Sequence, residues 1–249
     1  MCTVVCAWDP AAAVPVRMMA LRDELTSRVF DEPDAWWSEQ PDVIGGRDRR
    51  AGGTWCASAV SSGVTAVVLN RPERRVADPD APSRGVLPLL GTEHWHTWGE
   101  YVDIAGMASF NLVLATPDRL TWWSYDGAEL KDHEPAPGTH HITPTGLVEQ
   151  SVWARRPLEG VPTLDGQLDA LWGAWRAEVT GVPPSADPGA MIVSRTVEAD
   201  GATDIYQTVF GQFIAARPGR LRIDHARLPY RQNPWTTRTW SVTDGRLAP

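Results

Sequence analysis

The sequence predicts an α+β fold, a layered sandwich in which helices cover stacked antiparallel sheets. Three observations lead to this class. Many short apolar segments of strand length are separated by turn residues. Two longer stretches carry apolar residues at helical spacing instead. The 249 residues are enough for one core and contain no internal repeat and no clean linker, so a single domain over residues 1–249 is expected.

The first elements are expected to form a hairpin. Residues 2–8 alternate as a strand, and residues 16–23 form a second strand after a Pro-Ala turn segment. Antiparallel pairing places the end of the second strand near the start of the first, so Arg22 and Asp23 come close to Cys2. Because side chains alternate along a regular strand, only one of the two should point to the side of the thiol.

The rest of the chain continues as strands with two helical stretches. A second hairpin is expected to end on Asn70, and residues 72–88 lack periodicity, which indicates a long surface loop that could act as a lid. The expected helices span residues 92–105 and 163–179. The remaining expected strands are residues 56–60, 64–70, 109–116, 120–126, 190–197, 205–216, 219–226 and 236–243.

Composition excludes several classes of function. A net charge of -8 argues against a general nucleic-acid binder, which needs a surplus of basic side chains. No apolar run approaches the roughly 18 residues of a membrane span. The three cysteines suit a reducing compartment and the N-terminus does not resemble a secretory signal, so a cytoplasmic location is expected. The oligomeric state is open, with a homo-oligomer as one alternative.

Cys2 carries the most chemistry of any single residue. If Met1 is removed, Cys2 holds both a thiol nucleophile and a free amine. Such an amine has a pKa of roughly 7.7 to 8.0, against roughly 8.5 for a thiol, so it can accept the thiol proton near neutral pH. The alternative is an ordinary core cysteine.

Asn70 is a candidate for stabilising negative charge on a substrate. An asparagine at the end of an apolar strand can direct its amide N–H groups at an oxygen that develops charge beside the thiol. The chain has two other asparagines, Asn111 and Asn233. The alternative for Asn70 is a turn residue before Arg71 and Pro72.

No metal site is expected. His94 and His96 are two residues apart, which places them on different faces of a helix and makes a poor chelating pair. His140 and His141 are adjacent in a strand, so one points in and the other out. The sequence lacks a CxxCH motif, and any haem would therefore bind noncovalently. Haem is an alternative ligand rather than an expected cofactor.

Four sequence blocks resemble one family. They are MCTVV at the start, LRDE at residues 21–24, GGRDRRAGGTW at residues 45–55 and AVVLNRP at residues 66–72. Their order and spacing resemble the NRDE family, also called the transport-and-Golgi-organisation protein 2 family. The resemblance implies the αββα four-layer sandwich of N-terminal nucleophile hydrolases. It also implies Cys2 as nucleophile, Arg22 or Asp23 near its amine, and Asn70 as an oxyanion donor.

The chain departs from the family pattern at two places. Leu21 stands where the motif that names the family begins with asparagine, and Thr143 stands near the expected position of a second asparagine. These departures leave Cys2, Arg22, Asp23 and Asn70 as the residues that match. The predicted catalytic set is therefore these four residues.

Two functions follow as expectations. The first is a cysteine amidohydrolase or acyltransferase that acts on a small acyl or amide substrate through a Cys2 thioester. The second is a non-catalytic carrier of haem or of acyl-CoA or lipid-like ligands, because members of the family have been linked to their homeostasis. The tryptophan pairs at residues 36–37 and 122–123 indicate an apolar pocket, with core packing as the alternative. Arg47 could receive a carboxylate of a substrate, with a solvated loop as the alternative. The predicted binding residues are Trp36, Trp37, Arg47, Trp55, Trp122 and Trp123.

Overall fold

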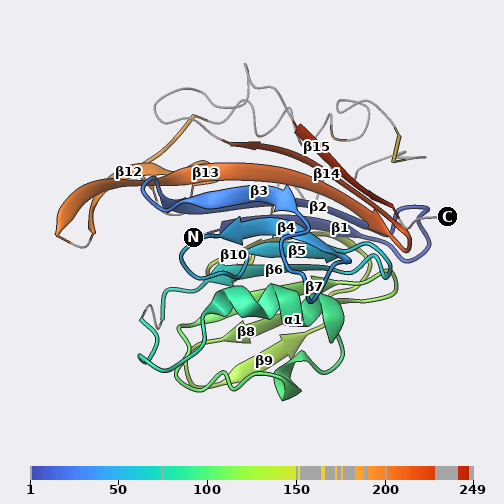
Figure 1. Ribbon diagram of the computed structural model, residues 1–249, viewed down its shortest axis with the longest axis horizontal. Coiled ribbons are helices and arrows are strands. Elements are labelled where there is room, and N and C mark those ends of the chain that lie inside the picture. Colours follow the sequence, from blue (N-terminus) through green and yellow to red (C-terminus); the bar gives the residue numbers. More distant parts are fainter. Residues whose placement is uncertain are drawn as a thin grey trace.

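The protein is built from two stacked antiparallel β-sheets, as a computed structural model shows (Figure 1). The structure describes residues 2–73, 76–149, 151, 164–165, 172, 175, 183–187, 190–199, 201–227 and 241–246. Within these residues the strands far outnumber the helical segments. None of the described helices is long and apolar enough to cross a membrane.

The first sheet contains the chain start. Its strands follow the order β11-β10-β1-β2-β13-β14-β15, and β12 pairs with the long strand β13 outside this path. The strands are β1 (Cys2–Trp8), β2 (Val16–Leu25), β10 (Gly138–Thr143), β11 (Gly146–Leu147), β12 (Ser194–Ala199), β13 (Ala202–Arg217), β14 (Arg220–Arg227) and β15 (Ser241–Arg246).

The second sheet follows the chain order, β3-β4-β5-β6-β7-β8-β9, so each strand pairs with the next one along the sequence. Such a meander needs only short connections between neighbouring strands, apart from the long segment between β6 and β7. The strands are β3 (Phe30–Asp34), β4 (Val43–Asp48), β5 (Cys56–Ala59), β6 (Thr65–Asn70), β7 (Phe110–Ala115), β8 (Leu120–Tyr125) and β9 (Leu130–His133).

The main core lies between the two sheets. Alternate residues of β1, among them Cys2, Val4 and Cys6, face the second sheet and join one apolar cluster with Val67 and Val113. The other residues of β1, such as Val5, belong to a separate cluster on the outer face of the first sheet. This alternation follows from the two-residue period of a strand, and it places the Cys2 side chain at one edge of the space between the sheets.

The helices lie within the segment that connects β6 to β7. A 3-10 turn, η1 (Arg84–Val86), runs into the helix α1 (Leu87–Glu93), which packs on the outer face of the second sheet (Figure 1). A second 3-10 turn, η2 (Trp98–Glu100), follows. Pro88 lies at the start of α1, where its missing N–H leaves no hydrogen bond unmade.

The predicted αββα four-layer sandwich is wrong. The described chain is dominated by antiparallel strands, and α1 is the only helix whose bounds it defines. The helix expected over residues 92–105 is wrong as well, because α1 ends at Glu93 and His94 leaves the helical conformation. The apolar spacing that suggested a helix arises from separate contacts, such as Trp98 against Phe110, made by η2 and irregular segments.

Most of the helix expected over residues 163–179 lies outside the described residues. Two described positions in it, Trp172 and Trp175, are helical and belong to the apolar cluster on the outer face of the first sheet. Trp172 stacks on Phe213 of β13 and donates a hydrogen bond to Asp224 of β14 at 2.8 Å. These two side chains therefore cover part of that face.

The two predicted N-terminal hairpins are confirmed. The strands β1 and β2 pair with Cys2 opposite Arg22, and β5 and β6 pair with Cys56 opposite Val67. Asn70 is the last residue of β6, as predicted. The sequence did not predict β3 and β4, whose glycines and charged residues are unusual in strands.

Candidate functional site

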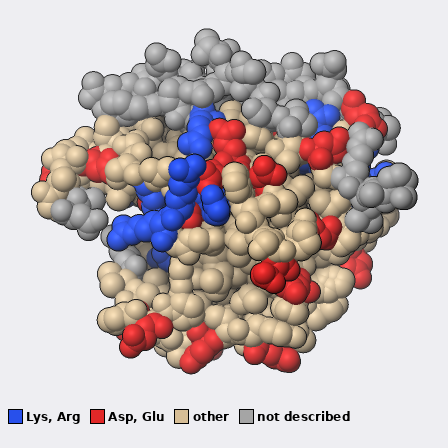
Figure 2. Space-filling model, in the orientation of Figure 1, with Lys and Arg blue, Asp and Glu red and all other residues tan. Residues whose placement is uncertain are grey.

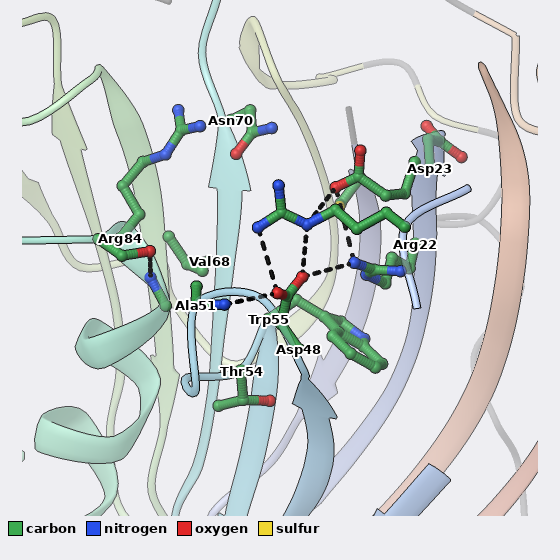
Figure 3. A pocket seen from close by; sticks show the side chains of 14 residues that line it. Arg22, Asp23, Asp48, Ala51, Thr54, Trp55, Val68, Asn70 and Arg84 are labelled. Atoms are coloured by element: carbon green, nitrogen blue, oxygen red, sulfur yellow. Dashed lines mark hydrogen bonds and ion pairs between the residues drawn. The ribbon is translucent and has the colours of Figure 1, made fainter. Parts of the chain in front are cut away.

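A charged cavity lies at the start of β1, where the two sheets meet (Figure 3). It has a volume of about 270 Å³ and is lined by residues of both sheets and of the segment that contains η1. Cys2 comes from β1, Asn70 from β6 and Arg84 from η1. The lining residues that carry charge are Arg22, Asp23, Glu24, Arg28, Asp48 and Arg84.

The register of the first hairpin decides which β2 residue faces the thiol. Cys2 pairs directly with Arg22, and direct partners in an antiparallel pair project from the same face of the sheet. Asp23 projects from the opposite face, where its carboxylate accepts a hydrogen bond from the Thr208 hydroxyl at 2.6 Å. Figure 3 shows the Asp23 carboxylate turned away from the Arg22 and Asp48 side chains.

Arg22 is a buried cation held from several sides. Its Nη2 atom donates to Asp48 at 3.0 Å, and its guanidinium carbon lies 4.5 Å from the Trp55 ring centre and 4.8 Å from that of Phe30. Contacts between a desolvated cation and aromatic faces are worth about 2 kcal/mol each. Burial lowers the pKa of Arg22, while the nearby charge of Glu24 opposes this. Arg22 is thereby fixed beside the thiol.

Asp48 holds two arginines of the cavity in place. Besides Arg22, it accepts hydrogen bonds from Arg28 at 2.7 and 3.2 Å and from the backbone N–H groups of Arg50 and Ala51, both at 3.0 Å. Burial alone would raise the pKa of Asp48, but these hydrogen bonds and charges outweigh it and the pKa is lowered. Asp48 is therefore ionised across the physiological range.

The Cys2 thiol is protonated in this environment. Only 6% of the residue is exposed, and this burial raises the pKa of the thiol. The negative charge of Asp23 raises it further, whereas the charge of Arg22 and a hydrogen bond from the Asp23 backbone N–H oppose the shift. A thiol in this state needs a base to become a nucleophile.

Asp23 is a cavity residue whose ionisation changes near neutral pH. Burial raises the pKa of its carboxyl group to about 6, although the hydrogen bond from Thr208 works against the shift. Its charge at pH 7 can therefore stabilise an ammonium group at the chain start.

Asn70 has an unused side chain. Among the described residues it forms no side-chain hydrogen bond, and Figure 3 shows its amide at the cavity beside Arg84. Asn111, by contrast, is fully engaged: it donates to the carbonyl oxygens of Thr143 and Pro144 and accepts from Trp122. Asn111 therefore ties β7 to the end of β10, and Asn70 remains available to a ligand.

Arg84 is a cavity residue that the sequence did not single out. It lies within residues 72–88, expected only as a surface loop, and its Nη1 atom donates to the Ser109 carbonyl at 2.8 Å. The sequence signal that could have marked it is the Ser83-Arg84-Gly85 triplet just before the apolar residues of α1.

Among the predicted binding residues, only Trp55 lines this cavity. Trp36 lies under the Arg47 guanidinium at 4.5 Å, and Trp37 donates to the Gly52 carbonyl. Trp122 donates to Asn111 in the core, and Trp123 packs on Trp98 at the outer face of the second sheet. These side chains are spread over the second sheet, and their role in binding stays a prediction.

No group of three or more potential metal ligands occurs within the described ranges. Among the histidines there, His94 stacks on Tyr101, and His140 lies 2.8 Å from the Ala136 carbonyl. His141 lies 2.9 Å from the Ser151 hydroxyl. None of the three lines the cavity, and haem binding stays a prediction.

Basic side chains gather on the face of the molecule seen in Figure 2, where they form a diagonal band that is flanked by acidic side chains. Several partly exposed arginines of the described chain are bound to carboxylates. Arg47 and Arg49 bind Asp31, and Arg227 binds Glu32.

Comparison with known proteins decides the family. The family model described as Transport and Golgi organisation 2 matches residues 1–158, which is more than half of the chain. The chain belongs to the transport and Golgi organisation 2 family. The family match includes the whole second sheet, the strands β1, β2, β10 and β11, and every residue that lines the cavity. No curated protein matches the sequence.

Proposed function

We propose that this member of the transport and Golgi organisation 2 family is a cysteine hydrolase or acyltransferase that uses Cys2, freed by removal of Met1, as its nucleophile. The observation that carries the proposal is the cavity itself. It combines a thiol at the chain start with an unengaged amide donor, Asn70, and a buried cation, Arg22. A buried cysteine of the core would need none of these polar neighbours.

The reaction follows from these groups. The free amine of Cys2 takes the thiol proton, and the sulfur attacks the acyl carbonyl carbon to form a tetrahedral intermediate. Asn70 donates to the oxyanion, and the amine returns the proton to the leaving nitrogen as the C–N bond breaks. Water or an acceptor amine then attacks the thioester carbon and loses a proton to the Cys2 amine. The C–S bond breaks, the acyl group leaves on the water or amine, and the ammonium returns the proton to the Cys2 sulfur.

Asp23 and Arg22 have separate roles in this scheme. Asp23 lies on the far face of β2 from the thiol, and its charge stabilises the ammonium form of the Cys2 amine. Arg22 faces the thiol and favours the thiolate and later negative charge. The raised pKa of the buried thiol makes such help necessary.

The test combines mass measurement with turnover. Intact mass should show a mature chain that begins with Cys2, and a panel of small amides should be hydrolysed by that chain but not by Cys2→Ala. Asn70→Ala should lower kcat by about 10²–10³-fold, the usual loss for one oxyanion donor. Asn111→Ala is unsuitable as a control because the Asn111 side chain ties β7 to the end of β10. Gln40→Ala, at a partly exposed position away from the cavity, is the control variant.

A chain that retains Met1 would refute the role of the amine. Equal turnover by the wild type and Cys2→Ala would refute the nucleophile. Unchanged kcat in Asn70→Ala would assign the oxyanion to another donor and remove Asn70 from the mechanism.

A further inference from the structure

One cation of the cavity has no carboxylate partner within the described part of the chain. Arg22 and Arg28 share Asp48, and Glu24 lies 3.6 and 3.7 Å from the same two arginines. Arg84 forms no ion pair with a described residue, and its side chain makes a single hydrogen bond, to the Ser109 carbonyl. A guanidinium has five N–H donors, so most of those on Arg84 remain available.

The available donors of Arg84 face the cavity. Arg84 lines it together with Cys2 and Asn70. Each side-chain nitrogen of Arg84 either has a hydrogen-bond partner or is accessible to solvent. Figure 3 shows its guanidinium directed toward the Asn70 amide on one wall, opposite the Arg22 and Asp48 pair. A ligand whose carbonyl is held by Asn70 therefore places a neighbouring group beside Arg84.

The backbone around Arg84 is held rigidly. The Thr54 N–H donates to the Gly85 carbonyl at 2.9 Å, and Ser83 caps the N–H of Gly85 at 3.3 Å. A Cβ atom on Gly53 would lie 2.4 Å from the Gly85 oxygen, so this approach requires glycine at position 53. These contacts fix the position of the Arg84 backbone, and the hydrogen bond to the Ser109 carbonyl holds one end of its guanidinium, which reduces the entropy lost when it binds an anion.

We propose that Arg84 binds a carboxylate of the substrate, so that the substrates are small amides that carry a carboxylate group. The reaction in this inference rests on the proposed function, while the binding step does not. Arginine suits a carboxylate because its planar donors can pair with both oxygens.

The size and polarity of the cavity agree with a small anionic ligand. Its volume of about 270 Å³ is below the roughly 300–1,000 Å³ typical of drug-sized ligands. Charged and polar side chains make up most of its wall, with Trp55 and Val68 as the larger apolar members. A long acyl chain would leave these charges without water, at a substantial cost in free energy.

A pair of alkylating agents tests the binding step without turnover. Iodoacetate and iodoacetamide both alkylate a cysteine: the sulfur forms a bond to the CH₂ carbon, iodide leaves and the thiol proton passes to solvent. They differ in the carboxylate. The rates at Cys2 are measured by peptide mass mapping, which separates it from Cys6 and Cys56. Burial raises the pKa of all three thiols, that of Cys6 to about 12, but only Cys2 of the three lines the cavity.

The ratio of the iodoacetate rate to the iodoacetamide rate is the readout. It should be higher at Cys2 than for free cysteine, and Arg84→Met should lower it by about ten- to a hundredfold, the usual worth of a hydrogen bond to a charged group. Arg217→Met, at an exposed arginine of the distant end of β13, is the matched control and should leave the ratio unchanged. An unchanged ratio in Arg84→Met, or an equal fall in Arg217→Met, would overturn the proposal.

A second variant separates the loss of the Arg84 charge from an effect of misfolding. Arg84→Gln keeps an amide N–H for the Ser109 carbonyl but loses the charge, and it should lower the ratio as Arg84→Met does. If Arg84→Gln has the thermal stability of the wild type and the ratio of the wild type, the proposal fails.

Substrate pairs then connect binding to turnover. The 4-nitroanilide of succinic acid carries a carboxylate, and its methyl ester is the neutral match. The wild type should favour the acid in kcat/KM, and Arg84→Gln should remove the preference. A carboxylate preference in alkylation without any turnover would leave the Arg84 site standing and refute the proposed reaction. Turnover of both compounds at equal kcat/KM would support the proposed reaction and refute carboxylate binding by Arg84.

Discussion

Asp48→Asn should destabilise the protein because it removes the anion shared by Arg22 and Arg28. The two hydrogen bonds to the backbone N–H groups of Arg50 and Ala51 can survive in part through the amide oxygen. The ion pairs at 3.0 Å and 2.7 Å cannot. Arg22 would then be a buried cation with its main partner gone, since its side chain is 4% exposed.

The size of the effect follows from this burial. Removing one partner of a buried ion pair costs about 3–5 kcal/mol. The Arg28 side chain is 28% exposed and can recover hydrogen bonds to water, so we expect the lower limit, about 3 kcal/mol. For a domain of this length that loss corresponds to a fall in Tm of about 6–12 °C.

The pH dependence of the free energy of unfolding gives a second, independent test. The pKa of Asp48 is lower in the folded protein than in the unfolded chain, so its contribution is present above the unfolded pKa of about 3.9 and is lost as the pH falls through the folded value. The difference in the free energy of unfolding between wild type and Asp48→Asn should therefore be largest near pH 7 and shrink toward pH 3.

Urea unfolding from pH 3 to pH 7 measures both quantities. Asp31→Asn is the matched control, because Asp31 also binds two arginines, Arg47 and Arg49, but their side chains are 36% and 60% exposed. We expect a smaller loss from it. Equal losses in the two variants, or a loss in Asp48→Asn that does not depend on pH, would show that the ionised Asp48 carboxylate does not stabilise the buried arginine.

Two further predictions concern the backbone and a buried histidine. Gly53→Ala should destabilise the protein and lower the iodoacetate preference at Cys2, because the added Cβ would collide with the Gly85 carbonyl. Gly99→Ala, where no heavy atom lies within 4 Å of the added Cβ, should change neither the stability nor the preference. Burial lowers the pKa of His141 to about 4, so stability should fall as the pH drops from about 6.5 to 4, and His141→Gln should remove this part of the pH dependence in urea titrations.

The sequence predicted local pairing better than architecture. Alternation along residues 2–8 and the turn before Val16 were enough to bring Arg22 and Asp23 close to Cys2, but they left open which of the two faces the thiol. The register of the hairpin in the structure assigns Arg22 to that position. The helix over residues 92–105 failed because aromatic residues at helical spacing can also serve irregular segments that pack on a sheet.

The site was predicted only where it lies on regular strands. Cys2, Arg22 and Asn70 lie on paired strands, and the structure brings them to one cavity. Arg84 was not predicted because a loop residue is positioned by tertiary contacts, which leave no periodic pattern in the sequence. Here the contact is the close approach of Gly53 to Gly85. The shared use of Asp48 by two arginines is likewise a tertiary property.

Trapping a thioester between Cys2 and its substrate separates a nucleophilic Cys2 from an ordinary core thiol. The protein is mixed with the 4-nitroanilide of succinic acid, quenched in acid and examined by intact mass and peptide mapping. We expect a chain that begins with Cys2 and carries one succinyl group on the Cys2 sulfur. This species should be more abundant in the wild type than in Arg84→Gln and absent in Cys2→Ala. A chain that retains Met1 and carries no acyl group on Cys2, while the anilide is still hydrolysed, would exclude Cys2 as the nucleophile.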